Sequence, residues 1–205
     1  MRWSLPWRLL ARFFFWITGW KLDGGTPEPR KYVMIAAPHT SNWDLPYMLA
    51  VAILADVNLQ FMIKHSVFIG PIGWWLKRMG GIPIVRHEKR SMVQQMVDRF
   101  NESEELALSV PPEGTRKRMP FWKSGFYRIA LEAKIPLMLG YLDYGKRRGS
   151  FGRPMHLSGD ITKDMDEIRA YYADKKGHNH ELFGLIVLES ELEAQRPQSA
   201  AGGGA

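Results

Sequence analysis

The chain has 205 residues, of which 45% are hydrophobic and 24% charged, so it is long enough for one globular domain and is not a disordered polymer. The absence of cysteine excludes disulfides, thiolate metal ligands and a cysteine nucleophile. A formal charge of +7 and eight tryptophans point to nucleic acid, a membrane surface or a phosphorylated small molecule as partner, although an ordinary basic soluble protein has a similar composition.

Residues 1–24 are predicted to form an amphipathic aromatic helix that associates with a membrane. The apolar run 13–17 is far shorter than the about 20 residues that cross a bilayer, and no small-residue cleavage site follows it. Indole rings favour the headgroup zone, and Arg8 and Arg12 can reach lipid phosphates. The tryptophans that bracket this helix are Trp3, Trp7, Trp16 and Trp20. The alternative is a helix that only packs against the domain.

After a turn cluster at 24–27, residues 25–195 alternate between short apolar runs and amphipathic segments. The expected strands are 32–37, 59–63, 82–85, 106–110, 137–142 and 155–161. The expected helices are 43–55, 92–100 with Ser91 as its cap, 124–134, 163–175 and 181–193. Residues 70–81 read as a loop-rich stretch, and the tail 196–205 is expected to be disordered. This order predicts an α/β fold, a three-layer domain whose mixed central sheet is flanked by helices, plus the N-terminal interfacial helix.

The sequence His-Thr-Ser-Asn-Trp-Asp at 39–44 places a histidine and a carboxylate five residues apart. On a continuous helix these positions would lie about 140° apart and would not meet. Pro38 should keep His39 in the loop, while Asp44 enters the first helical turn, with Ser41 or Asn42 as the cap. An imidazole held by a carboxylate can take a proton from a hydroxyl. The alternative is a core histidine beside a capping aspartate.

The sequence Pro-Pro-Glu-Gly-Thr-Arg at 111–116 follows an expected strand. The two prolines end the strand, Gly114 permits a tight turn, and Arg116 could present its planar guanidinium to a phosphate. Taken alone, the motif could equally be a charged turn.

With two further blocks, these motifs resemble the lysophospholipid acyltransferases, a family that includes the 1-acylglycerol-3-phosphate acyltransferases. The blocks are HTSNWD (39–44), KHSVFIGPIGWWLKRMGGIPIVR (64–86), PPEGTR (111–116) and AKIPLMLGY (133–141). They occur in the family's order, and the resemblance covers about 32–144. One departure is Pro111, which stands where the family usually has phenylalanine.

The resemblance implies a role for each matching residue. His39 would be the general base and Asp44 would orient it. Arg86 and Arg116 would bind the acceptor's phosphate, and Pro136 would help to shape the site. The implied substrate-binding residues are Lys64, Arg86, Glu113, Gly114, Thr115 and Arg116. The mechanism requires no metal and no cofactor besides acyl-CoA or acyl-ACP as co-substrate.

The implied activity is transfer of a fatty acyl group from acyl-CoA or acyl-ACP to a lysophospholipid, with 1-acylglycerol-3-phosphate giving phosphatidic acid. The protein would act on the cytoplasmic side of the membrane, as a peripheral or monotopic protein that binds no nucleic acid. Another lipid acceptor, or a non-catalytic lipid-binding protein on this fold, is the alternative. The chain has no G-x-S-x-G motif of a serine hydrolase, and its basic residues are too scattered for a nucleic-acid module. His178 and His180 lack the spacing of a helical metal pair.

Two further basic segments each allow two interpretations. Trp74 and Trp75, beside Lys77 and Arg78, could form a second membrane contact or pack in the core. The segment 146–148 could be a solvated loop or a lipid-binding cluster.

Overall fold

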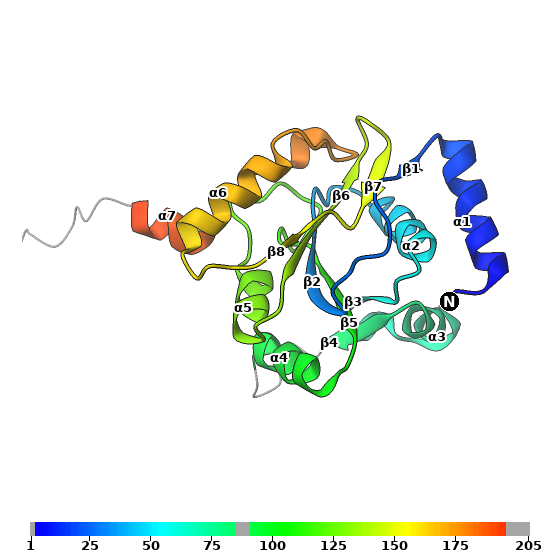
Figure 1. Ribbon diagram of the computed structural model, residues 1–205, viewed down its shortest axis with the longest axis horizontal. Helices are drawn as coiled ribbons and strands as arrows, with labels where there is room; N and C mark the ends of the chain where they lie inside the picture. Colours follow the sequence, from blue (N-terminus) through cyan, green and yellow to red (C-terminus); the bar gives the residue numbers. More distant parts are fainter. Residues whose placement is uncertain (1–2, 85–90, 196–205) are drawn as a thin grey trace, which may run out of the picture.

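A mixed β-sheet crosses the centre of the computed structural model, which describes residues 3–84 and 91–195 (Figure 1). Within these residues the strand order is β1-β7-β6-β2-β5-β3-β4, and β8 pairs with β6. The pairs β6–β7 and β6–β8 are antiparallel, and all the others are parallel. The predicted α/β class with a mixed sheet is therefore confirmed.

The strands are β1 (Lys21–Leu22), β2 (Lys31–Ala36), β3 (Leu59–Lys64), β4 (Gly81–Ile84), β5 (Leu106–Val110), β6 (Leu137–Asp143), β7 (Arg148–Ser150) and β8 (Pro154–Met155). The α-helices are α1 (Leu5–Thr18), α2 (Asp44–Leu54), α3 (Gly70–Arg78), α4 (Met92–Glu102), α5 (Gly125–Glu132), α6 (Ile161–Tyr172) and α7 (Glu189–Gln195). Two short 3₁₀ helices are η1 (His65–Val67) and η2 (His180–Leu182).

Both faces of the sheet are buried, which is why its central strands are continuous apolar runs. In β2, Val33 and Ile35 face the core shared with α4, α5 and α6. The alternate residues Tyr32 and Met34 face the core shared with α1 and α2. Figure 1 shows these helices on opposite sides of the sheet, with α1 outside α2 at the edge of the molecule. The arrangement confirms the three predicted layers.

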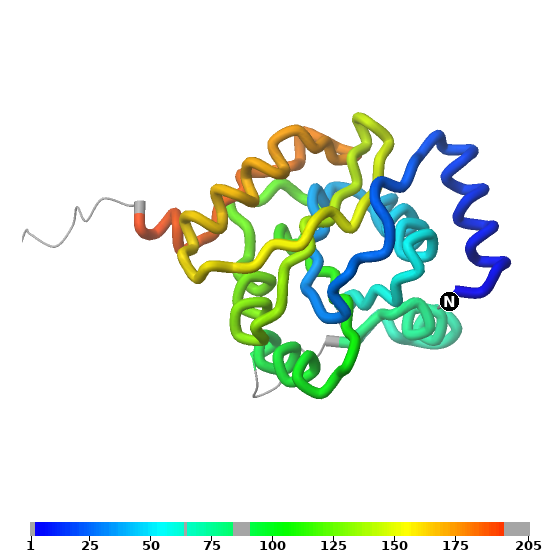
Figure 2. Tube along the Cα trace, in the orientation of Figure 1, coloured from blue at the N-terminus to red at the C-terminus, as the bar shows by residue number. Residues whose placement is uncertain are grey.

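The N-terminal helix α1 packs on α2 through Ala11 and Phe15 and ends at Gly19, whose φ of 70° forms a left-handed cap. Figure 2 shows it at one side of the molecule, leading by a short turn into the sheet. Two of its flanking tryptophans differ from expectation. Trp3 donates from Nε1 to the Val57 carbonyl at 2.9 Å, and Trp20 is buried. Both therefore anchor α1 to the domain.

The stretch 70–81, expected to be loop-rich, instead contains α3. Pro71 lies in the first turn, where its fixed φ suits a helix and its missing N–H costs nothing. Gly73 is required by packing, because a Cβ there would lie 2.3 Å from the backbone carbon of Phe68. The residues that suggested a loop therefore have other roles: Pro71 helps to start α3, and Gly73 lets the helix pack closely against the Phe68 backbone.

The N-termini of two other helices can be compared with the sequence predictions. Ser91 caps α4 by accepting a hydrogen bond from the Gln94 N–H, as predicted. The cap of α2 is Trp43 rather than Ser41 or Asn42, and it makes no side-chain cap bond. Ser41 Oγ instead accepts from the Trp43 N–H inside the preceding loop.

The C-terminal predictions were too long. The strand expected at 155–161 is reduced to Pro154–Met155 in β8. The helix expected at 181–193 is divided into η2 and α7, because the intervening segment bonds to another part of the chain: the Trp122 N–H donates to the Val187 carbonyl at 2.7 Å. The tail 196–205 and Arg86 lie outside the described residues.

Within the part of the chain that the structure describes, no helix has both the length and the apolar character needed to span a bilayer.

Candidate active site

His39 and Asp44 meet in the loop between β2 and α2. Asp44 is the first residue of α2, and His39 lies in the loop that leaves the carboxyl end of β2. His39 Nδ1 is 3.0 Å from Asp44 Oδ2. The carboxylate is buried, whereas the imidazole is partly exposed. The turn before the helix therefore brings together two residues whose spacing would separate them on a continuous helix.

The Asp44 carboxylate is held by hydrogen bonds to both oxygens. Oδ2 accepts from the backbone N–H groups of Thr40 at 2.9 Å and Ser41 at 3.0 Å. Oδ1 accepts from the Tyr144 hydroxyl at 2.9 Å. Because Nδ1 of His39 faces this carboxylate, Nε2 is the nitrogen of the neutral ring that can accept a proton.

Glu113 holds the histidine from its backbone side. Its Oε2 accepts from the His39 backbone N–H at 3.0 Å, and the residue is only 3% exposed. Burial raises the pKa of Glu113 to about 8, with a smaller contribution from the charge of Asp44, despite the hydrogen bond from His39. Glu113 is therefore mainly protonated at neutral pH, and it contacts the His39 loop from inside the protein.

The other residues of 111–116 form the turn after β5. Gly114 has a φ of 66°, and a Cβ there would press on the side chain of Lys123. Thr115 Oγ1 accepts from the Lys117 N–H at 3.4 Å. Arg116 is exposed and lines the same cavity as His39.

The two remaining residues implied by the resemblance are placed differently. Lys64 is the last residue of β3, and its backbone pairs with that of Ile84 in β4. Arg86 follows β4 and, as noted, lies outside the described residues.

A cavity of about 370 Å³ extends from His39, Asp44 and Arg116 to the space between α2 and the sheet. Its volume lies within the range of about 300–1,000 Å³ usual for small-molecule sites. Most of its wall is apolar. Side chains that form the wall include Met34, Met48, Val51, Leu59, Phe61 and Phe151. The cavity can therefore hold a hydrocarbon chain with its reactive end beside the histidine.

Two residues from distant segments complete the site, and no sequence motif marked either of them. The Asn179 side chain donates to the Thr40 carbonyl at 2.9 Å, and the Asn179 N–H donates to Thr40 Oγ1 at 3.1 Å. Tyr144, the residue that follows β6, donates from its hydroxyl to Asp44 Oδ1. Tyr144 lies just after the last family-like block, and Asn179 lies well beyond it. Only the fold brings these two residues next to the segment 39–44.

Among the described residues, no group of three or more histidine, aspartate and glutamate side chains has the arrangement of a metal site.

The fold and the pair define a class of α/β protein in which a carboxylate-held histidine stands at the mouth of an apolar cavity. The sequence pattern of the Acyltransferase family matches residues 24–138, more than half of the chain, and the chain belongs to this family. It is an acyltransferase, as the sequence motifs predicted.

The fold is also that of a characterised enzyme. The crystal structure of the 1-acyl-sn-glycerophosphate (LPA) acyltransferase PlsC from Thermotoga maritima superimposes with a TM-score of 0.56. The match covers 81% of this chain and 75% of that one, at 15% sequence identity. At this identity the likeness concerns the fold. None of the curated protein sequences matches the chain.

Proposed function

We propose that this acyltransferase moves a fatty acyl group from acyl-CoA or acyl-ACP to the hydroxyl of a lysophospholipid, with 1-acylglycerol-3-phosphate as acceptor and phosphatidic acid as product. The observation that carries the proposal is that the His39–Asp44 pair lines an apolar cavity of about 370 Å³, which Arg116 also lines. The structurally similar Thermotoga maritima protein is a 1-acyl-sn-glycerophosphate acyltransferase, which supports the same class of acceptor.

The proposed reaction is direct transfer. His39 Nε2 takes the proton of the acceptor hydroxyl as the oxygen attacks the thioester carbonyl carbon, and Asp44 stabilises the imidazolium that forms. The tetrahedral intermediate then collapses, the carbon–sulfur bond breaks, and the departing thiolate takes the proton from the imidazolium. The products are an ester and a free thiol. General-base assistance of this kind contributes roughly 10²- to 10⁴-fold to the rate.

Arg116 supplies the proposed recognition of the acceptor's phosphate. Its guanidinium can form two parallel hydrogen bonds to phosphate oxygens, and such a contact would place the acceptor's hydroxyl beside His39. Arg86 and Lys64 are proposed to contribute to the same anionic subsite, as the family resemblance implies.

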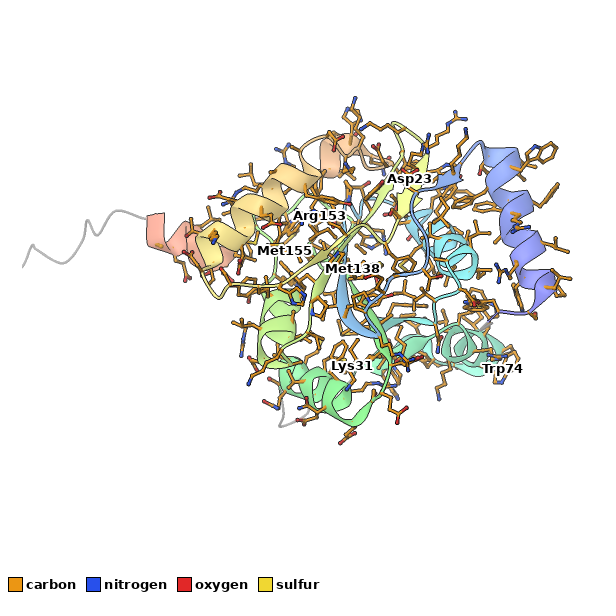
Figure 3. The ribbon with its side chains drawn as sticks, in the orientation of Figure 1. Asp23, Lys31, Trp74, Met138, Arg153 and Met155 are labelled. Carbon is orange, nitrogen blue, oxygen red and sulfur yellow. The ribbon has the colours of Figure 1, made fainter. Side chains whose placement is uncertain are left out.

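We also propose that the enzyme works on a lipid surface, on the cytoplasmic side of the membrane, as a peripheral or monotopic protein. The large apolar side chains of α1 and α3 that are exposed are Leu5, Trp7, Leu9, Leu10, Phe13, Trp16, Ile17, Ile72, Trp74 and Trp75. These residues are called the α1–α3 surface below. Trp16 is 76% and Trp74 69% exposed, and Figure 3 shows Trp74 projecting from α3. Exposed indoles beside Arg12 and Lys77 suit an anionic lipid interface.

The segment 146–148 belongs to the fold rather than to this surface. Arg148 Nη1 is 2.6 Å from Asp23 Oδ1, and Arg147 Nη1 donates to the Thr18 carbonyl. These contacts favour the interpretation as a structural turn over that as a lipid-binding cluster.

The decisive experiment is acyl transfer by the purified protein with paired donors, acyl-CoA and acyl-ACP, and a panel of lyso-lipids, measuring thiol release and lipid product together. Wild type is compared with His39→Ala and with His180→Ala, a matched control at an exposed histidine. We expect transfer to 1-acylglycerol-3-phosphate that only His39→Ala abolishes. Transfer to a different lyso-lipid would overturn the named acceptor, and lipid binding without transfer would favour the non-catalytic alternative.

A further inference from the structure

The two oxygens of the Asp44 carboxylate have different numbers of hydrogen-bond partners. Its Oδ2 receives two backbone N–H groups and faces His39 Nδ1. Within the described residues, the Tyr144 hydroxyl is the only hydrogen-bond donor to Oδ1. The donor lies 100 residues from Asp44 and beyond the segment 24–138 that matches the family pattern.

We propose that Tyr144 is a positioning residue of the reaction: its hydroxyl fixes the Asp44 carboxylate, which in turn orients and stabilises His39. This inference rests on the proposed general-base mechanism. Tyr144 is not among the described residues that line the cavity, so its effect on the substrate is exerted through Asp44.

The physical reason is the geometry of a carboxylate. With Oδ1 unbonded, the group could rotate about its Cβ–Cγ bond, and Oδ2 would no longer be kept both on the loop N–H groups and on the imidazole. A buried carboxylate oxygen that loses its donor also loses the stabilisation of a charge-assisted hydrogen bond. Both changes should slow the step in which His39 takes the proton of the acceptor hydroxyl.

Tyr144 is itself rigidly supported. Its ring meets those of Trp20, Tyr47 and His178 edge to face, with centroid distances of 4.8, 5.6 and 5.0 Å. Its backbone N–H donates to the Lys176 carbonyl at 2.9 Å. A hydroxyl carried on a ring packed in this way loses little conformational freedom when it binds Asp44.

The hydroxyl also remains a donor across the working pH range. Burial, together with the adjacent charge of Asp44, raises the pKa of Tyr144 well above its ordinary value. The other ionisable groups near this contact are His39 on the carboxylate, Glu113 beneath the His39 loop, and Tyr47 and His178 against the Tyr144 ring.

The test is Tyr144→Phe, which removes only the hydroxyl. We expect kcat to fall by on the order of tenfold or more while KM for donor and acceptor stays within about twofold.

The matched control is Tyr127→Phe. Tyr127 likewise donates to a buried aspartate, with its hydroxyl 2.8 Å from Asp164 Oδ2, but it lies on α5. It should lower thermal stability by a similar amount and leave kcat unchanged. A fall in kcat of equal size in both variants would mean that the Tyr144 bond only stabilises the fold, and would overturn the proposal.

A double-mutant cycle makes the test independent of stability. If Tyr144 acts through Asp44, adding Tyr144→Phe to Asp44→Asn should change the residual kcat by less than about twofold. Independent, multiplicative losses would contradict the inference, as would an unchanged kcat in Tyr144→Phe. Activity retained by His39→Ala would instead refute the underlying mechanism, so the two failures can be told apart.

Discussion

Glu113 and His39 are joined by a hydrogen bond from the His39 backbone N–H to Glu113 Oε2, at 3.0 Å, although the residues lie 74 positions apart. The bond ties the turn after β5 to the loop after β2. Two residues of the family-like motif at 111–116 therefore have different positions. Glu113 is buried and holds the His39 loop, whereas Arg116 lines the cavity.

The raised pKa of Glu113 predicts how stability depends on pH. The folded protein holds this proton up to its raised pKa of about 8, whereas the unfolded chain releases it near the ordinary glutamate pKa of 4.5. The folded state thus binds more protons between these pH values, so the free energy of unfolding should fall as pH rises through this window, by on the order of 1 kcal/mol per pH unit. Glu113→Gln keeps an oxygen acceptor for His39 and should lose this component.

Urea unfolding of wild type and Glu113→Gln from pH 5 to 9 measures the difference. Glu132→Gln, at a partly exposed glutamate paired with Arg128, is the control and should follow wild type. Parallel curves for wild type and Glu113→Gln would show that Glu113 is ionised in the folded state. Glu113→Gln should keep its acyltransferase activity near neutral pH if the active enzyme has a protonated Glu113.

Arg116→Ala should weaken use of the phosphate-bearing acceptor. Loss of hydrogen bonds to a charged group predicts an increase of roughly 10- to 100-fold in KM for 1-acylglycerol-3-phosphate, with little effect on KM for the donor. Arg118→Ala changes an exposed arginine in the same turn and is the control. An unphosphorylated monoacylglycerol should be used equally by both variants. An increase in KM for the acyl donor alone would indicate that Arg116 binds the donor instead of the acceptor.

Val51→Phe should shorten the acyl chains that are accepted. Val51 lines the cavity and lies seven residues beyond Asp44, or about 10 Å farther along α2. A larger ring there would fill the apolar space, so the preferred thioester should become several carbons shorter, as a donor panel from short to long chains can measure. Leu54→Phe, at a half-buried position of the same helix that is not in the described cavity wall, should keep the wild-type profile. An unchanged profile in Val51→Phe would place the acyl chain elsewhere.

The α1–α3 surface predicts binding to anionic vesicles. Trp16→Ala and Trp74→Ala should each reduce the vesicle-bound fraction several-fold in sedimentation, and the double variant should reduce it further, because both helices expose indole rings. Leu185→Ala removes an equally exposed apolar side chain from another segment and should bind like wild type. Higher salt should weaken binding, since Arg12 and Lys77 accompany the rings. Equal binding by all variants would contradict a role for this surface.

The sequence by itself determined the features that depend on short range. The apolar run of β2, the Ser91 cap of α4 and the approach of His39 to Asp44 follow from residues within a few positions of one another. Local periodicity, capping and the turn before α2 carry the necessary information, because each involves hydrogen bonds or burial within one element. The same holds for the alternation of strands and helices that predicted the α/β fold.

Tertiary structure decided the remainder. Trp20 was predicted to face lipid and is buried instead, because the turn after α1 brings its ring to 4.2 Å from that of Tyr47. The donor to Asp44 Oδ1 comes from Tyr144, and Asn179, 139 residues from Thr40, closes the loop on the other side. Such contacts depend on which strand ends meet at one edge of the sheet, and on which buried polar groups must then find partners. The spacing of residues in a local motif contains no information about which strand ends meet or which buried polar groups pair.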